Sequence, residues 1–354
     1  MKIPEFKYKV LDENPPGSFL DICLIGDINN DGLPDIVIGG KEGKINLFWY
    51  RNPDWKIFKI ASIPNLEAGG VLFDINNDGY LDIIAGQQEG GNLLLWFENP
   101  GEEKENWKFH IIEDRFEKYH DQAVGDIDGD GEVEILISSQ NAGVIAYFDI
   151  PDNPRVSPWP EECCHVIAEN LPDIEGLCIA DINNDGKNEL IIGPNIFFPP
   201  DNPGKAWKRK ILSSELVKTR VAVGDIDGYG RLEIVFSEGE SFPGRLVWVS
   251  ISDWKFHLLR DDLFHPHSLA VADFNGDGLL DIFVAEMGLG KNSDPKMFVY
   301  LNKGNGKFEE VIIQCGIPTH EAKVGDLTGN GLPDIAGKPY HPEKHIDIWI
   351  NESR

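Results

Sequence analysis

The sequence predicts an all-β fold, a seven-bladed β-propeller with four strands in each blade. Three observations predict it: a motif that repeats along the whole chain, short apolar runs around each copy, and a terminal segment that completes the last repeat. The motif is Asp-x-[Asn/Asp]-x-Asp-Gly-x-x-[Asp/Glu]-[Ile/Leu], and a period of about 50 residues is typical of propellers and related arrays. The seven copies begin at Asp27, Asp74, Asp126, Asp181, Asp225, Asp273 and Asp326.

Each repeat contains four short runs that we expect to be strands. In the first repeat, residues 22–25 precede the motif, residues 36–39 follow it, residues 47–52 form a third run that ends in Asn, and Trp-Lys at 55–56 marks a fourth. The runs are rich in β-branched and aromatic residues and are bounded by Gly, Pro, Asn and Asp, as strands are. Four strands per repeat and seven repeats give a seven-bladed propeller.

The two ends of the chain together complete the last blade. The final repeat supplies only three strands, which end near Ile350, whereas residues 6–11 match the pattern of the fourth-strand run 254–259. We therefore expect residues 6–11 to form the outer strand of the last blade and to close the ring, which leaves no long unpaired edge between blades. Because the repeat occupies nearly the whole chain, residues 1–354 are expected to form one domain.

Composition excludes several classes of partner. The net charge is −28, which argues against binding to nucleic acid or to an anionic membrane. The chain has no apolar run long enough to span a bilayer, and residues 1–5 show no apolar signal region, so a cytoplasmic location is expected. The five cysteines are an odd number without metal-site spacing.

The seven acidic loops predict calcium sites. Positions 1, 3, 5 and 9 of the motif offer side-chain oxygens, which are the ligands that Ca²⁺ takes, and the Gly at position 6 allows a sharp turn. An EF-hand is excluded because position 12 of the first loop is Ile38, inside a strand. The alternative is a set of Asx-turns without metal. The fifth loop is damaged by Tyr229, and the seventh is weakened by Thr328 and Asn330. The predicted ligands in the five remaining loops are Asp27, Asn29, Asp31, Asp35, Asp74, Asn76, Asp78, Asp82, Asp126, Asp128, Asp130, Glu134, Asp181, Asn183, Asp185, Glu189, Asp273, Asn275, Asp277 and Asp281.

These motifs resemble the FG-GAP/VCBS repeat family, whose members are β-propellers stapled by calcium. The resemblance covers the whole chain and implies a structural role for Ca²⁺ in the loops. It says little about activity, because propellers host many functions.

One register of the repeat gathers residues that suit a transition metal. The residues six positions before each motif should lie where the inner strands enter the central channel, so that they converge on one axis. Three imidazoles and a carboxylate, either Glu175 or Asp21, form a ligand set suited to Zn²⁺, Mn²⁺ or Fe²⁺ rather than to Ca²⁺. The alternative is a wet polar channel without metal. The residues at this register are Asp21, Ala68, His120, Glu175, Thr219, His267 and His320.

Further candidates come from the same face of the propeller. One position after the register residue of the fifth repeat is Arg220, which is expected to bind a substrate anion or oxyanion. The loop between the second and third strands returns to this face and brings candidate substrate-binding and catalytic residues. Tyr340 and His341 are a candidate base and acid pair, and ordinary rim residues are the alternative. The loop candidates are Gln87, Gln140, Glu286, Lys338, Tyr340 and His341.

Some segments resemble a narrower group. Residues 265–269, 285–287, 320–323 and 337–340 are similar to the propeller domain of aldos-2-ulose dehydratases, and rhamnogalacturonan and ulvan lyases also place elimination chemistry on propellers. The resemblance implies a carbon–oxygen lyase that acts on a carbohydrate, namely a keto-sugar, an anhydro-sugar or a saccharide that contains uronic acid.

In the mechanism that fits this resemblance, a metal ion in the central channel, Zn²⁺ or Mn²⁺, is held by His120, His267 and His320 and stabilises an enolate. We call the end of the channel where these residues lie the funnel. Tyr340 or His341 exchanges the protons. Two alternatives stay open. One is a non-catalytic, calcium-stabilised propeller that binds carbohydrate or protein, and the other is a metal-dependent hydrolase.

Overall fold

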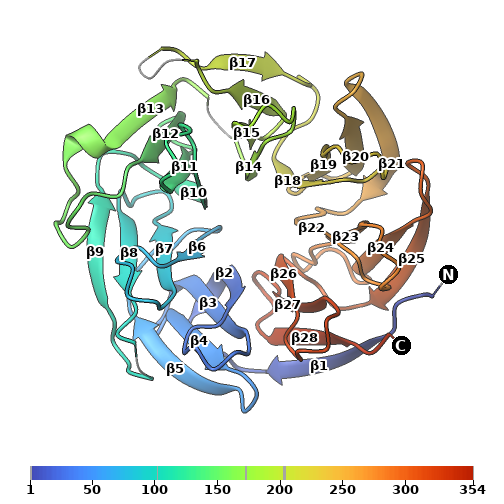
Figure 1. The fold of residues 1–354 in the computed structure, drawn as a ribbon. Helices are drawn as coiled ribbons and strands as arrows, with labels where there is room; N and C mark the ends of the chain where they lie inside the picture. The colour runs from blue at the N-terminus through green and yellow to red at the C-terminus, as the bar shows by residue number, and fades with distance from the viewer. Residues whose placement is uncertain (1, 102, 172–173, 202–204, 354) are drawn as a thin grey trace.

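The computed structural model describes residues 2–101, 103–171, 174–201 and 205–353. Its strands form seven four-stranded antiparallel sheets arranged as blades around a central axis (Figure 1). The predicted fold is thus confirmed. No helix of the described residues is long and apolar enough to cross a bilayer.

Within each blade the strands follow one another outward from the axis. From the innermost strand outward, the first blade is β2 (Ser18–Gly26), β3 (Asp35–Glu42), β4 (Leu47–Arg51) and β5 (Lys56–Ala61), and the second is β6 (Val71–Phe73), β7 (Asp82–Gly86), β8 (Leu94–Glu98) and β9 (Lys108–Glu113). The third blade is β10 (Tyr119–Gly125), β11 (Glu134–Ser139), β12 (Val144–Phe148) and β13 (Cys164–Ala168), and a 3₁₀ helix, η1 (Glu161–Cys163), precedes β13. The fourth blade is β14 (Leu177–Ala180), β15 (Glu189–Ile192), β16 (Asn195–Phe198) and β17 (Lys208–Ile211).

The last three blades repeat this order. They are β18 (Thr219–Gly224), β19 (Glu233–Glu238), β20 (Gly244–Ser250) and β21 (Lys255–Leu263); β22 (Ser268–Ala272), β23 (Asp281–Ala285), β24 (Lys296–Asn302) and β25 (Phe308–Cys315); and β26 (Glu321–Gly325), β27 (Asp334–Lys338), β28 (Ile346–Asn351) and β1 (Phe6–Asp12).

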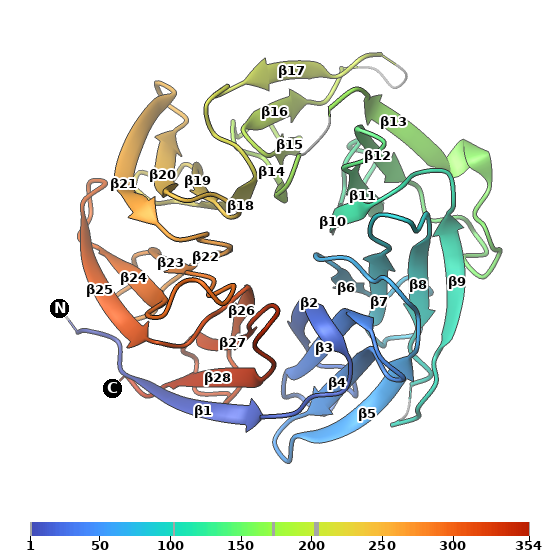
Figure 2. The ribbon, with the colours of Figure 1, turned by 180° about the vertical axis from the view of Figure 1, so that it is seen from behind.

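The N-terminal strand closes the ring. β1 runs antiparallel to β28, with Phe6 opposite Asn351 and Tyr8 opposite Trp349. Seen from behind in Figure 2, the strand from the blue end of the chain lies along the outer edge of the red blade, with both termini on that side. The predicted outer strand at residues 6–11 is confirmed, and it extends by one residue to Asp12.

The hydrophobic core lies between the blades. One cluster joins Ile22 and Trp49 of the first blade to Ile83, Leu95 and Phe97 of the second, and all five side chains are essentially inaccessible to solvent. Similar clusters fill the seams between other blades. Because apolar strand faces are covered by the next blade, burial holds the blades at fixed angles around the axis.

In the described part of the chain, a buried asparagine links neighbouring blades at four seams. The side-chain amide of Asn99, after β8, donates to the carbonyl oxygens of Leu81 in its own blade and Ile28 in the preceding blade, both at 2.9 Å. Its backbone N–H donates to Asp82, the ninth residue of the motif, at 2.7 Å. The other asparagines with the same three bonds are Asn52, Asn302 and Asn351.

Candidate active site

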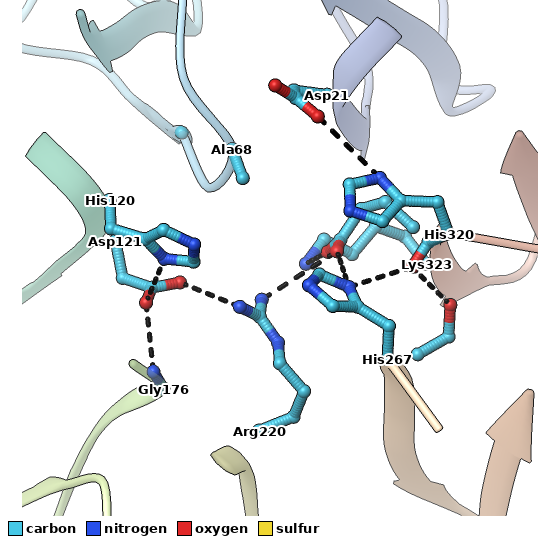
Figure 3. A network of polar contacts seen from close by, with 12 residues as sticks. Asp21, Ala68, His120, Asp121, Gly176, Arg220, His267, His320 and Lys323 are labelled. Carbon is cyan, nitrogen blue, oxygen red and sulfur yellow. Dashed lines mark hydrogen bonds and ion pairs between the residues drawn. The ribbon is translucent and has the colours of Figure 1, made fainter. Parts of the chain in front are cut away.

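The register residues predicted to converge do lie around the axis. Figure 3 shows Asp21, Ala68, His120, His267 and His320 turned toward the channel from different blades. Gly69 brings the second blade close to the third. A Cβ atom there would lie 2.5 Å from the carbonyl oxygen of His120, and its φ of +85° suits glycine.

A cavity of about 330 Å³ opens at this end of the channel. Five residues named from the sequence line it: Asp21, Ala68, His120, His320 and Tyr340. Most of the other walls come from charged or titratable residues that the sequence reasoning did not single out as site residues. They are Lys41, Glu67, Lys218, Glu240 and His265.

Ion pairs cross the channel at Arg220. Its guanidinium lies 3.2 Å from an oxygen of Asp121 in the third blade and 3.7 Å from an oxygen of Glu321 in the seventh (Figure 3). Asp121 also accepts the backbone N–H of Gly176 at 2.9 Å. Burial opposes the charge on Arg220, but the two carboxylates outweigh it and raise its pKa. Because these protein carboxylates already pair with it, the arrangement is that of a tie between blades rather than of a group held open for a substrate anion.

Three ligating groups come together beside this network. Atoms of Glu175, Glu240 and His267 lie within 4.8 Å of one another. His267 Nδ1 donates to the carbonyl oxygen of His320 at 2.8 Å, which leaves Nε2 as the ring nitrogen available to a ligand. His267 Nε2 and Glu175 Oε2 are buried and have no hydrogen-bond partner. Such groups are costly to leave unpaired in a protein interior, so they point to a missing ligand.

The rest of the Glu175 carboxylate is held in place. Gln140 donates from Nε2 to Glu175 Oε1 at 2.8 Å, so Gln140 orients a candidate ligand. Burial would raise the pKa of Glu240, but Lys218 and His267 outweigh it and lower the pKa to about 2. Glu240 therefore stays ionised at neutral pH and offers a charged oxygen to a cation.

The three register histidines differ in what holds their Nδ1 atoms. His120 Nδ1 lies 2.8 Å from a carboxylate oxygen of Asp121, and His267 Nδ1 faces a backbone carbonyl. His320 Nδ1 instead lies 2.7 Å from the ammonium nitrogen of Lys338. Among the described residues the three rings do not form a group with all ligating atoms within 4.8 Å of one another. A metal centre made of all three imidazoles stays a prediction, whereas Glu175, Glu240 and His267 already meet.

The electrostatic surroundings give His120 and His320 different protonation states. Burial would lower the pKa of His120, but Asp121 and Glu175 outweigh it and raise the pKa to about 9. For His320, burial, Lys338 and His267 all lower the pKa well below its ordinary value. At neutral pH the cavity therefore has one cationic and one neutral imidazole in its wall.

A second wall of the cavity is built around Lys41. Its ammonium lies 2.8 Å from an oxygen of Asp21 and 3.8 Å from one of Glu67, and the Tyr340 hydroxyl is 3.3 Å away. Asp21 is thereby engaged with Lys41 and lies outside the Glu175 group. Burial and Asp21 raise the pKa of Tyr340, so Tyr340 is a neutral phenol that donates a hydrogen bond. Glu67 Oε2 is buried and has no hydrogen-bond partner.

The other predicted loop residues, Gln87, Glu286, Lys338 and His341, are not among the residues that line the cavity. His341 is exposed and stacks on Phe19, with ring centroids 4.8 Å apart. Gln87 donates to the carbonyl of Pro64 at 2.9 Å, and Glu286 accepts the backbone N–H groups of Phe264 and Lys296. Gln87 and Glu286 therefore hold their own loops in shape. Lys338 is fully buried beside His320.

The positions of Lys41, Glu67 and Glu240 in the repeat could have identified them as cavity residues. Glu240 follows β19, in the same loop between second and third strands that supplied candidates in other blades. Lys41 is the last residue but one of the corresponding strand, β3, of the first blade, and Glu67 precedes the register residue Ala68. Extending the alignment of this loop to every blade finds Lys41 and Glu240.

The acidic loops adopt tight turns stabilised by their own carboxylates. In the second loop Asp74 accepts the backbone N–H groups of Asp78 at 3.1 Å and Gly79 at 2.8 Å. These are the Asx-type bonds expected with or without a cation. Carboxylate groups with ligand atoms within 4.8 Å of one another occur in the third loop and in the fifth, which the sequence marked as damaged. The two groups are Asp126, Asp128 and Glu134, and Asp225, Asp227 and Glu233.

Comparison with known proteins agrees with the repeat architecture. A family model described as FG-GAP-like repeat matches residues 74–137 and 273–337, and each match spans two consecutive motifs. These two segments are similar to FG-GAP-like repeats, and they lie on a seven-bladed β-propeller. Integrin alpha-PS5 of Drosophila melanogaster is 31% identical over 105 residues, which are 27% of this chain and 10% of the integrin. The chain thus matches only a small part of that relative.

Solved structures support the propeller fold. A chain in the crystal structure of BBS1N in complex with ARL6DN, soaked with lead, aligns with a TM-score of 0.54 over 98% of this chain and 95% of its own length. A chain of the mitotic checkpoint complex aligns with a TM-score of 0.59 over 99% and 92%. Both are 9% identical to this chain, so they show the fold alone.

Proposed function

We propose that this propeller is a metal-dependent carbon–oxygen lyase that removes water or an alcohol from a carbohydrate by β-elimination in the funnel. The class of substrate is a keto-sugar, an anhydro-sugar or a saccharide that contains uronic acid. The observation that carries the proposal is the group of Glu175, Glu240 and His267, two of whose buried ligating atoms are unpartnered beside a cavity lined by acids and bases.

The donor chemistry of this group fits a divalent transition metal. One imidazole and two carboxylates suit Mn²⁺ or Zn²⁺, and a metal bound there would supply a Lewis acid for a substrate oxygen. His267 is oriented for this role by its bond to the carbonyl of His320, and Glu175 by Gln140. Such outer contacts are the usual way in which ligands are positioned.

Two further residues are placed to move protons. Glu67 lines the cavity, and its buried Oε2 has no hydrogen-bond partner, so it is the base that removes the proton from the carbon next to the carbonyl. His120 is cationic at neutral pH and is oriented by Asp121, so it donates a proton to the departing oxygen, which leaves as water or alcohol. The Tyr340 hydroxyl, beside Lys41, donates a hydrogen bond that orients the sugar. The proton taken by Glu67 returns to His120 through solvent, which resets both groups.

Product analysis tests this function. The purified protein, loaded with Mn²⁺ or Zn²⁺, is incubated with a panel of keto-sugars, anhydro-sugars and uronic acid oligosaccharides, and the ultraviolet absorbance of a conjugated product is followed. Glu67→Gln is expected to lower kcat by about 10²–10⁴-fold, whereas Glu89→Gln, an exposed glutamate of the same blade, keeps full activity. A saturated product formed with uptake of water would show hydrolysis instead. Binding of a saccharide without turnover would favour the non-catalytic module.

We also propose that Ca²⁺ binds the acidic loops and has a structural role. The support is the donor set, because hard cations prefer clustered carboxylate and carbonyl oxygens and the loop carboxylates already lie together at Asp126, Asp128 and Glu134. Calcium titration followed by thermal unfolding tests it. A melting temperature that is unchanged by a chelator would count against a structural role for calcium.

A further inference from the structure

Lys338 is placed against the inner side of His320. It is the last residue of β27 and pairs with Glu321, so that its backbone carbonyl accepts the N–H of His320 at 2.8 Å. The Lys338 side chain is fully buried. Its ammonium nitrogen lies 2.5 Å from the carbonyl oxygen of Leu20 and 2.7 Å from His320 Nδ1.

The hydrogen-bonding inventory decides which of these groups donates. An ammonium group has three donors and no acceptor, so His320 Nδ1 must accept. In a neutral imidazole only one nitrogen is protonated, and the proton is therefore on Nε2. The competing acceptor for a proton on Nδ1 is Asp21, but its nearer oxygen is 3.7 Å away and its other oxygen is 2.8 Å from Lys41.

In the two other register histidines, Nδ1 is a hydrogen-bond donor rather than an acceptor. His120 Nδ1 faces the carboxylate of Asp121, and His267 Nδ1 faces a backbone carbonyl oxygen, so both donate from Nδ1. Of these three histidines, only His320 has a cation at Nδ1. This arrangement leaves Nε2 of His267 available to a metal, whereas it favours a proton on Nε2 of His320.

We propose that Lys338 fixes His320 in the Nε2–H tautomer, so that His320 donates a hydrogen bond to the substrate oxygen on which negative charge develops. The proposal rests on the proposed elimination for the identity of that oxygen. His320 lines the cavity, and with Nδ1 taken by Lys338 its remaining ring nitrogen is the one left for a ligand. The ring is held by stacking on His267, with centroids 4.2 Å apart, and by Tyr340 at 4.9 Å.

The chemistry balances without a change in the charge of His320. When the base removes the proton on the α-carbon, the electron pair forms the enolate double bond and the carbonyl electrons move to oxygen. The Nε2–H group donates to that oxygen without transferring its proton. The enolate then expels the leaving oxygen, which takes a proton from the acid. Donors aimed at developing charge in a closed site are among the strongest contributors to catalysis, and Lys338 acts as a positioning residue.

Nitrogen NMR of ¹⁵N-histidine-labelled full-length protein tests the tautomer directly. His320 signals are assigned by their loss in His320→Gln. The expected result is a protonated Nε2 and an unprotonated Nδ1 in the wild type and in Asp21→Asn, with Lys338→Met shifting the population toward protonated Nδ1. A wild-type His320 protonated on Nδ1, or on both nitrogens, would overturn the proposal. If Lys338→Met fails to fold, the wild type and Asp21→Asn still decide the question.

Kinetics with a turned-over sugar then separate donation from a structural role. His320→Ala should lower kcat about 10²–10³-fold with little change in KM, and His320→Gln, which keeps an N–H donor, should recover part of the loss. Equal losses in both variants would refute donation by His320. The NMR result does not depend on turnover, so a protein without lyase activity that shows the expected tautomer would refute the proposed function alone.

Discussion

The asparagine that links blades offers a quantitative test of how the ring is held. Replacing Asn99 by Ala removes two hydrogen bonds of 2.9 Å and leaves the carbonyls of Ile28 and Leu81 without these donors. An unsatisfied buried polar group costs about 1–3 kcal/mol. We therefore expect Asn99→Ala to lower the free energy of unfolding by about 3 kcal/mol.

That loss corresponds to a measurable shift in melting temperature. At an unfolding entropy of about 2.1 cal/mol/K per residue, the 354-residue chain has a total of about 0.7 kcal/mol/K. The expected decrease is about 4 °C by differential scanning calorimetry at fixed calcium concentration. The control is Asn14→Ala, at an exposed position, which should change the melting temperature by less than about 1 °C. A shift for Asn99→Ala no larger than for this control would refute the reasoning.

Two further predictions concern the pH dependence of stability, which depends on the acidic loops, and the cavity residue Tyr340. Burial raises the pKa of Asp35 and of Asp82 to about 7, above the ordinary value near 4. Without bound calcium, the folded chain therefore binds these two protons more tightly than the unfolded chain does. In the presence of a chelator, the melting temperature should fall as pH rises from about 4 to 7. Saturating Ca²⁺ should weaken or reverse this trend, and a rise with pH in chelator would contradict it. Tyr340→Phe, which removes the hydroxyl beside Lys41, should lower kcat/KM for the sugar about 10-fold or more through the lost hydrogen bond; unchanged kinetics would show that the phenol does not contact substrate.

The fold was predictable because its information is local and repeated. A turn motif and apolar runs recur seven times, so that an error in one repeat is corrected by the others, and residues 6–11 could be matched to an outer strand by pattern alone. The closing pair of β1 and β28 confirms this. The third-strand asparagine was visible as a pattern, but its bond to the preceding blade was not, because the bond depends on how two blades pack.

The sequence predicted where the site residues lie better than it predicted which side chains contact one another. The repeat register identified His120, His267 and His320 because symmetry carries equivalent positions to one axis. It did not reveal that Arg220 bridges two carboxylates, because these ion pairs join blades that are distant in sequence. It also did not reveal that Lys338 contacts His320, because that contact within the seventh blade depends on side-chain direction. Glu240 lies in a loop of irregular backbone, where side-chain direction does not follow strand periodicity.

The central claim is that a transition metal binds Glu175, Glu240 and His267, and metal analysis tests it most directly. Inductively coupled plasma mass spectrometry would be run on the wild type, Glu240→Gln, His267→Ala and the control His165→Ala, whose histidine lies on the outer strand β13. The expected result is near-stoichiometric Mn or Zn in the wild type and control, lost in the two funnel variants while calcium is retained. Equal transition-metal content in all four proteins, or calcium alone, would contradict the account.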